Sequence, residues 1–338
     1  MANITDSDGW VNVTRPEATD LALGGNEVNF PGKFFRELAS RDRWIRNQLE
    51  SLFGLGDTVA QDTTAEFTQV GVSAIAQGRL TVVSGDPFGV AVGAGTLYYT
   101  PYNGDYIALY DSANSRWNLR QFTEVSFSLS GLGAEANYDV FAFWNGSSVS
   151  LQTVPWAVQG FGNSVRAQAI SQINGTWVKS SDNRRYLGTI RTSGVGQTEV
   201  SGGSVFVWNV QNQVPRSLYV TQPVEYNYNN VAYRFANNST TAARVQVVVG
   251  LPNVVSAIVV ARVGMAAGAR AVSVAIGENS TVALAPVGQQ FATADAAGTI
   301  NTTRTVTIPL GANFYNTLES TGFNSPLRNP AILMQLNA

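Results

Sequence analysis

Short runs of β-branched and aromatic residues, each ended by Gly, Asn, Asp or Pro, dominate the chain from Phe67 onward. Runs of this kind are typical of β-strands. Val125 to Leu129 alternates apolar and polar residues strictly, which predicts a strand with one buried and one wet face. Predicted strands in the first part of this region cover residues 80–83, 96–99, 106–110, 125–129 and 138–143.

Turn-forming residues separate these runs. Asn103-Gly104 and Asn145-Gly146 are strong signals for tight turns, because Asn and Gly both tolerate a positive φ. Residues 111–115 fit the loop of a hairpin. Between residues 166 and 173 the pattern instead predicts one short helix.

Pro215-Arg216 marks a boundary, after which a second series of strand-like runs begins. The spacing of these runs favours a sandwich or jelly-roll-like domain, and the lack of a fixed-period repeat argues against a β-helix. The predicted strands are residues 219–224, 231–235, 243–249, 257–263, 271–276, 282–285, 303–308 and 331–336.

The first part of the chain has a different pattern. Residues 1–31 are expected to be extended, and a helix is predicted from Lys33 to Phe53, ended by Gly54. Five of its apolar residues fall on a and d positions of a heptad, with Asp42 interrupting the a row. Two interpretations stay open: an amphipathic helix packed on its own domain, or a short helical bundle among subunits. In the second interpretation the oligomerisation residues are Phe35, Leu38, Ile45, Leu49 and Leu52.

The whole pattern predicts a mainly β protein with an N-terminal extended segment and helix, a central β-module and a C-terminal β-sandwich or jelly-roll-like domain. A chain of 338 residues suits two or three domains. We assign residues 1–60 to an N-terminal segment with the helix and residues 61–215 to a central β-body. Residues 216–338 form the expected β-sandwich.

Composition adds that the surface is poor in charge. Charged residues make up 13% of the chain and hydrophobic residues 44%, whereas about 25% of an average domain is charged. Ser, Thr, Asn, Gln and Gly must therefore build much of the surface. This profile is typical of extracellular and virion β-proteins, and it suits chains that bury surface against copies of themselves.

Missing residue types exclude several chemistries. The chain has no His and no Cys, which excludes disulfides, thiolate metal sites and a Ser-His-Asp triad. Only cations that prefer oxygen ligands remain, and Asp6-Ser7-Asp8-Gly9 lacks the later Glu of an EF-hand loop, so we expect a turn there. We expect no metal and no cofactor. A net charge of −2 and a pI near 5.3 provide no basic field for nucleic acid.

Neither the N-terminal residues nor the longest apolar run has the pattern of a segment that enters a membrane. Residues 1–6 lack the basic and apolar regions of a signal peptide. The longest apolar run, residues 254–267, is interrupted by Ser256, Arg262 and Gly264 and is too polar to span a bilayer. We therefore expect synthesis in a cytoplasm and no membrane insertion.

Carboxylates are the remaining candidates for catalysis. A glycoside hydrolase needs two of them on either side of the scissile bond. The candidates stand at predicted loops and strand ends, where solvated acids are common, and their spacing in sequence says nothing about their distance in space. We therefore expect no enzymatic activity from the residues Asp105, Asp111, Glu124, Glu135 and Asp139.

Aromatic residues gather in two clusters that suit sugar binding, because rings stack on pyranose faces and neighbouring amides bond hydroxyl groups. The alternative is a core role, since tyrosines in strands alternate between the two faces. The first cluster comprises Tyr98, Tyr99, Tyr102, Tyr106 and Tyr110. The predicted receptor-binding residues are Tyr226, Tyr228, Tyr233, Phe314 and Tyr315, and loops at residues 289–297 and 313–329 are equally plausible recognition surfaces.

An ordered series of blocks fills the centre of the chain: Gly78-Arg79-Leu80-Thr81-Val82, Leu97-Tyr98-Tyr99-Thr100-Pro101-Tyr102-Asn103-Gly104, Ile107-Ala108-Leu109-Tyr110-Asp111, Asn137-Tyr138-Asp139-Val140-Phe141, Arg184-Arg185-Tyr186-Leu187-Gly188-Thr189-Ile190-Arg191, Phe206-Val207-Trp208-Asn209 and Val214-Pro215-Arg216. This series, over roughly residues 75–216, resembles a β-structured module of bacteriophage tail fibres and related virion appendages. Three further segments are similar to the C-terminal β-domain of the same proteins: Ser273-Val274-Ala275-Ile276-Gly277, Asn279-Ser280-Thr281, and the stretch from Ile308-Pro309-Leu310-Gly311 to Glu319. Ala312-Asn313-Phe314-Tyr315 stands where that family often has Tyr-His or Tyr-Tyr.

The resemblance implies a trimer, an N-terminal attachment segment, a distal C-terminal domain and no catalytic residues. We therefore expect a homotrimeric tail fibre or spike of the phage virion that binds a host cell-surface polysaccharide multivalently. Residues 1–60 would form an attachment segment with a trimerising helix and dock to a tail or baseplate protein. Residues 216–338 would form the receptor-binding domain. The alternatives are a capsid decoration or head-fibre protein and, third, a glycan-depolymerising tailspike.

Overall fold

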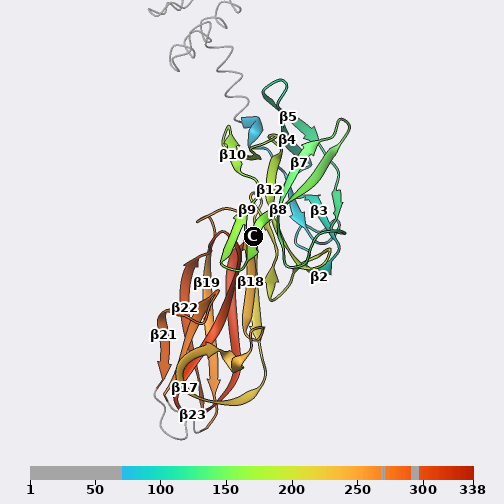
Figure 1. Cartoon of the computed structure of the whole chain (residues 1–338). Helices are drawn as coiled ribbons and strands as arrows, with labels where there is room; N and C mark the ends of the chain where they lie inside the picture. Colours follow the sequence, from blue (N-terminus) through green and yellow to red (C-terminus); the bar gives the residue numbers. More distant parts are fainter. Residues whose placement is uncertain (1–70, 268, 270, 291–296) are drawn as a thin grey trace, which may run out of the picture. The chain divides into compact units, whose positions relative to one another are not determined.

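The computed structural model describes residues 71–267, 269, 271–290 and 297–338. Residues 72–338 form one compact unit. The predicted fold class is confirmed, because this part of the chain is built almost entirely of β-strands (Figure 1), with short helical turns such as Ala236–Asn238. The attachment segment, its helix and the turn at residues 6–9 lie outside the described residues.

The strands before residue 215 are short and mostly antiparallel. They form a three-stranded sheet in the order β1-β3-β6, a separate β4–β5 hairpin, and a group of strands around β12. Their bounds are β1 (Gly78–Thr81), β2 (Ala91–Ala94), β3 (Thr96–Pro101), β4 (Tyr106–Asp111), β5 (Arg116–Gln121), β6 (Val125–Ser128), β7 (Asn137–Trp144), β8 (Val149–Gly160), β9 (Asn163–Arg166), β10 (Ile170–Ile173), β11 (Thr176–Lys179), β12 (Arg185–Gly194), β13 (Gln197–Val200), β14 (Ser204–Val205) and β15 (Val207–Asn209).

The predicted hairpin loop at residues 111–115 is confirmed, since Asp111 pairs with Arg116 across the β4–β5 ladder. Asn145-Gly146 lies in the loop of the β7–β8 hairpin. Asn103-Gly104 also lies in a turn, but β3 and β4 on either side of it pair with other strands. This turn therefore passes the chain from one sheet to another and does not close a hairpin.

The helix predicted near residues 166–173 is wrong. Its ends belong instead to β9 and β10. The reason is the Asn174-Gly175 pair that follows, in which both residues have positive φ, 48° and 77°. Such a two-residue loop matches the twist of antiparallel strands, so residues 170–173 pair with 176–179 as a hairpin.

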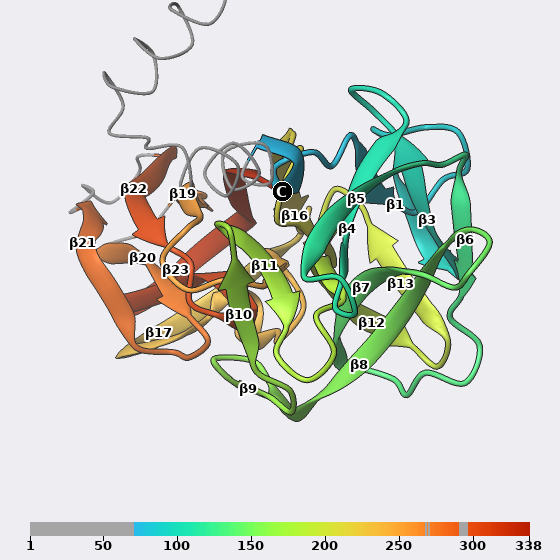
Figure 2. The same cartoon turned by 90° about the horizontal axis from the view of Figure 1, so that it is seen from above.

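The strands after residue 215 form the β-sandwich. The clearest is β19, where Ala257, Val259, Ala261 and Val263 are buried and the residues between them are more exposed. Figure 2 shows β19–β22 on one side of the unit and β1–β6 on the other. The bounds are β16 (Pro215–Thr221), β17 (Glu225–Phe235), β18 (Arg244–Val249), β19 (Ser256–Met265), β20 (Val272–Glu278), β21 (Ala283–Gln290), β22 (Gly298–Thr307) and β23 (Gly311–Asn337).

The long strand β23 organises the sandwich. Its first half pairs with β18 and β20, and its second half pairs with β16 and β19. The two halves lie close together, because Thr317 Oγ1 donates a hydrogen bond of 2.7 Å to the carbonyl oxygen of Ala331. β23 therefore contributes to both faces of the sandwich.

A buried polar network joins the central strands to the sandwich. Arg166 on β9 contacts Asp139 on β7, Tyr186 on β12 and the carbonyl oxygen of Gly250, which follows β18. Thr189 adds a hydrogen bond of 2.7 Å to Asp139. One hydrophobic core also runs from the central strands into the sandwich, so the two groups of strands are packed as a unit.

Candidate functional site

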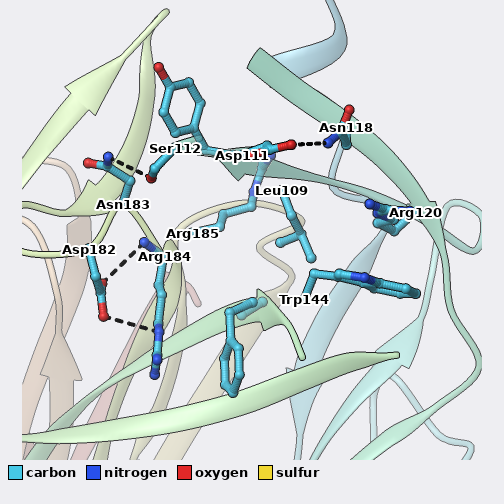
Figure 3. A pocket seen from close by; sticks show the side chains of 13 residues that line it. Leu109, Asp111, Ser112, Asn118, Arg120, Trp144, Asp182, Asn183, Arg184 and Arg185 are labelled. Atoms are coloured by element: carbon cyan, nitrogen blue, oxygen red, sulfur yellow. Dashed lines mark hydrogen bonds and ion pairs between the residues drawn. The ribbon is translucent and has the colours of Figure 1, made fainter. Parts of the chain in front are cut away.

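A cleft of about 390 Å³ opens between the β4–β5 hairpin, the end of β7 and the loop that leads into β12 (Figure 3). It combines aromatic rings with charged and amide side chains. The residues that line it are Leu109, Tyr110, Asp111, Ser112, Asn118, Arg120, Ala142, Phe143, Trp144, Asp182, Asn183, Arg184 and Arg185.

Asp111 fixes the hairpin side of the cleft. Its carboxylate accepts hydrogen bonds from the backbone N–H of Ala113 (3.1 Å) and Asn114 (3.3 Å) and from the amides of Asn114 (2.8 Å) and Asn118 (3.2 Å). These donors, first of all the Asn114 side chain, lower the pKa of Asp111. Asp111 is therefore an ionised loop-forming residue, as expected of an Asp that closes a turn.

The loop of residues 180–184 forms the opposite wall. Asn183 has a φ of 59°, and its side-chain amide donates to Ser112 Oγ at 3.1 Å, which ties the loop to the hairpin. Asp182 pairs with Lys179 Nζ at 2.7 Å and with Arg184 Nε at 3.1 Å. The negative charge of Asp182 is therefore balanced within the loop.

Two arginines lie against aromatic rings at the end of β7. The guanidinium carbon of Arg120 is 4.2 Å from the centre of the Trp144 ring, and that of Arg184 is 4.1 Å from the Phe143 ring. Arg185 has a different role, because it is buried and donates to the carbonyl oxygens of Ser73 (2.7 Å) and Ala108 (3.0 Å). Burial lowers the pKa of Arg185 to about 10, so it remains a cation at neutral pH.

The first predicted aromatic cluster is divided between the cleft and the core. Tyr110 lines the cleft and stacks edge-on against Trp117, with ring centres 5.3 Å apart. Tyr99 is buried against Phe122, with ring centres 4.9 Å apart, and burial raises its pKa to about 12. The tyrosines therefore take both roles that the sequence left open.

Tyr226 and Tyr228 come together around the buried carboxylate of Glu319. The Tyr226 hydroxyl and Arg234 Nε both donate to Glu319, the latter at 2.8 Å, and Arg234 lies 3.6 Å from the centre of the Tyr228 ring. Burial raises the pKa of Glu319 even though Tyr226, Arg234 and the backbone N–H of Asn237 donate to it. Tyr233 is half-buried on the same strand.

The other two predicted receptor residues lie elsewhere. Phe314 packs among Phe161 and Phe235, with ring centres 5.5 and 6.2 Å away, and beneath Arg244 at 3.8 Å. Tyr315 is fully buried, because it begins a stretch of β23, Tyr315 to Thr321, whose residues are buried on both faces. We therefore remove Tyr315 from the candidate surface.

Most of the weighed carboxylates are held in intramolecular contacts. Asp139 forms the ion pair with Arg166, and Asp105 accepts a hydrogen bond of 2.7 Å from Gln121. For Glu124, burial alone would raise the pKa, but hydrogen bonds from Ser84, Gly85 and Thr100 lower it. Within the described ranges, no cluster of acidic residues is arranged to hold a metal ion. In the same ranges, no helix has the length and apolarity required to cross a membrane.

The sequence had indicated Tyr110 and Asp111 but missed Trp144, Arg120 and Arg184. One local signal could have identified Trp144, because it directly precedes the Asn145-Gly146 turn and so stands at an exposed strand end. Nothing in the sequence indicates that the two arginines meet rings from other strands.

Comparisons with known proteins add little to this site. No protein-family model matches the chain, and no curated protein matches it. Among solved structures, the globular domain of zebrafish complement 1qA is 12% identical, with 35% of this chain and 94% of that chain covered and a TM-score of 0.22. BuGH86 in complex with neoagarooctaose is 10% identical, with 73% and 32% covered and a TM-score of 0.22. The insecticidal delta-endotoxin Cry8Ea1 from Bacillus thuringiensis is 5% identical, with 79% and 55% covered and a TM-score of 0.25. TM-scores this low support no inference about function.

Proposed function

We propose that this protein is a subunit of a phage virion appendage, a tail fibre or spike, that attaches to a bacterial cell-surface glycan through the cleft. The observation that carries the proposal is the pairing of aromatic rings with polar side chains in one opening, namely Trp144, Phe143 and Tyr110 beside Asn118 and Asn183. Apolar walls with a few oriented polar groups are typical of small-ligand sites. The resemblance of residues 75–216 to phage fibre proteins supports the virion assignment.

Self-association as a homotrimer is part of this proposal. The outer face of the sandwich supports it, since Tyr219, Leu333 and Val260 are directly opposite one another across β16, β23 and β19. Tyr219 and Ile258 on this face are exposed. A second copy covering the face would remove this apolar surface from water. Residues 1–60, with the helix residues named above, would dock to a tail or baseplate protein.

The pKa shifts of the acidic residues favour adhesion to a glycan without its hydrolysis. A glycosidase that uses two carboxylates needs one of them as a proton donor, and such an acid has a raised pKa. The hydrogen bonds to Asp111 lower its pKa instead. Glu319, whose pKa is raised, is fully buried and cannot meet a polysaccharide. Glu278, whose pKa burial also raises, is on β20 and does not line the cleft.

The binding test uses the purified full-length protein on an array of bacterial surface glycans. We expect saturable binding, and we expect Trp144→Ala to weaken it about fivefold or more, since a ring that contacts the ligand contributes about 1 kcal/mol or more. Tyr106→Ala is the matched control, because it removes an exposed ring from the same hairpin without altering the cleft. Equal binding by wild type and Trp144→Ala would show that the cleft is not the contact site.

The place of this protein on the phage particle distinguishes the proposed tail fibre or spike from a decoration or head-fibre protein. Gold-labelled antibody against residues 216–338 should mark tail appendages in electron micrographs. Label spread over the head would contradict a tail fibre and favour a decoration or head-fibre protein. Release of reducing ends from a bound polysaccharide would instead reveal a depolymerase.

A further inference from the structure

Arg120 differs from the other buried and half-buried arginines of the described chain in its lack of a polar partner. Arg166, Arg184 and Arg234 pair with Asp or Glu, and Arg185 donates to backbone carbonyl oxygens. Arg120 makes neither a hydrogen bond nor an ion pair with any described residue, and its Nε is buried without an acceptor. A half-buried cation that pairs with no carboxylate keeps its N–H donors for an anion supplied from outside.

Trp144 holds this arginine ready for such a ligand. The contact of 4.2 Å between the guanidinium and the indole ring restricts the side chain. A guanidinium presents its N–H donors in a rigid fork that matches a carboxylate in a two-bond arrangement. Because Arg120 is already positioned, less conformational entropy is lost when a carboxylate binds.

The other residues that line the cleft indicate how much charge the ligand carries and to which class of molecule it belongs. Asp111 and Asp182 line the same cleft, so a doubly charged phosphate would meet two carboxylates, whereas a single carboxylate needs only one free cation. Ser112, Asn118 and Asn183 offer hydrogen-bonding groups for hydroxyls. Phe143 and Trp144 at the end of β7 each carry a guanidinium over one ring face, and the rest of each ring offers apolar surface. This combination matches a saccharide that carries one carboxylate on a ring.

We propose that the cleft is selective for acidic saccharides, uronic or sialic-type sugars, and that Arg120 binds the sugar carboxylate. This inference rests on the proposed glycan attachment and specifies its ligand class. The positive charge of Arg120 and the bidentate geometry of its donors, rather than the rings alone, then determine which glycans are bound.

The test compares each acid with its own neutral form. Full-length protein is titrated in NMR experiments with the methyl glycosides of glucuronic, galacturonic and N-acetylneuraminic acid, and with the methyl ester of each. We expect at least one acid to bind about tenfold or more tightly than its ester, because hydrogen bonds to a charged partner are about twice as strong as neutral ones. Sodium chloride at high concentration should reduce this difference.

Arginine variants assign the preference to one side chain. Arg120→Gln should abolish the difference between acid and ester, and Arg120→Lys should retain part of it, because the charge remains while the fork is lost. Arg116→Gln is the matched control, since it removes the same charge from an exposed position on the same strand and should keep the full preference. All variants should melt within about 4 °C of the wild type, because Arg120→Gln loses the contact with Trp144 but no hydrogen bond or ion pair.

Each failure has a distinct meaning. Equal affinity for acids and esters would overturn the acidic selectivity and leave glycan attachment intact. Absence of binding to both forms, with glycan-array binding retained, would overturn the inference and place the contact outside the cleft. Absence of both array binding and sugar binding would overturn the proposed function as well. An acid preference that persists in Arg120→Gln would refute the role of Arg120.

Discussion

Replacing Arg166 with alanine should strongly destabilise the described unit. Arg166 Nε lies 2.6 Å from Asp139 Oδ2, and Nη2 lies 3.2 Å from Oδ1 and 3.1 Å from the Tyr186 hydroxyl. The side chains of Arg166 and Asp139 are only 12% and 2% exposed. Arg166→Ala would leave the buried Asp139 carboxylate with Thr189 as its remaining side-chain donor among the described residues.

The magnitude follows from the burial of the pair. Removing one partner of a buried ion pair typically costs about 3–5 kcal/mol, because the other charge stays buried and uncompensated. At roughly 2–4 °C per kcal/mol for a large domain, the melting temperature should fall by about 6–20 °C. Loss of the hydrogen bond to the Gly250 carbonyl oxygen adds to this effect, since that bond joins the central strands to the sandwich.

Thermal and urea unfolding of the full-length protein measure the effect, with two comparisons. Arg184→Ala removes the more exposed pair with Asp182, and it should cost about 1 kcal/mol or less. A double variant, Arg166→Leu with Asp139→Leu, removes both charges and should lose less stability than Arg166→Ala alone. The reasoning is refuted if Arg166→Ala unfolds within about 1 kcal/mol of the wild type.

Two further predictions concern a close backbone approach and a buried acid. Gly188→Ala would place a Cβ against the carbonyl oxygen of Trp208, deep inside contact distance, and should destabilise by about 3 kcal/mol or more in urea unfolding. Gly95→Ala would meet only the Gly196 carbonyl oxygen, at an ordinary contact distance of 3.9 Å, and should change little. Burial raises the pKa of Glu319 in the folded state above its ordinary value of 4.5. Between the two pKa values the folded state holds more protons than the unfolded state, so the free energy of unfolding should fall as the pH rises above 4.5. Glu319→Gln should flatten this part of the stability curve, and an unchanged pH dependence would contradict the assignment.

Strands that bury only one of their two faces could be predicted from the sequence. β19 follows the period of two through Ala257, Val259, Ala261 and Val263, and the sequence placed a strand there. β12 was missed because it pairs on both edges, with β7 and with β15, and is buried on both faces along most of its length. Its polar residues find partners far away in sequence, as when Arg185 donates to the carbonyl oxygen of Ser73. No local window contains that information.

The candidate site was only partly predictable for the same reason. Tyr110 and Asp111 stand beside an evident hairpin loop, so they could be chosen as polar and aromatic residues at a strand end. The cleft exists only because the loop around Asn183 bonds to Ser112 and because Arg120 reaches Trp144 from another strand. These contacts depend on how β4, β5, β7 and β12 are assembled, which the spacing of residues does not determine.

The cleft and the tyrosines around Glu319 differ in how many of their polar groups are free to bind a ligand. Tyr226, Tyr228 and Arg234 already satisfy the buried Glu319 and one another. A glycan that recruited them would first have to break those contacts, and Glu319 would lose its donors. Arg120 has no polar contact to break. Binding at the cleft therefore needs less rearrangement than binding at the predicted tyrosines. A trimer that exploits avidity must then leave the β4–β5 hairpin accessible in each copy and associate through another face, such as that of Tyr219.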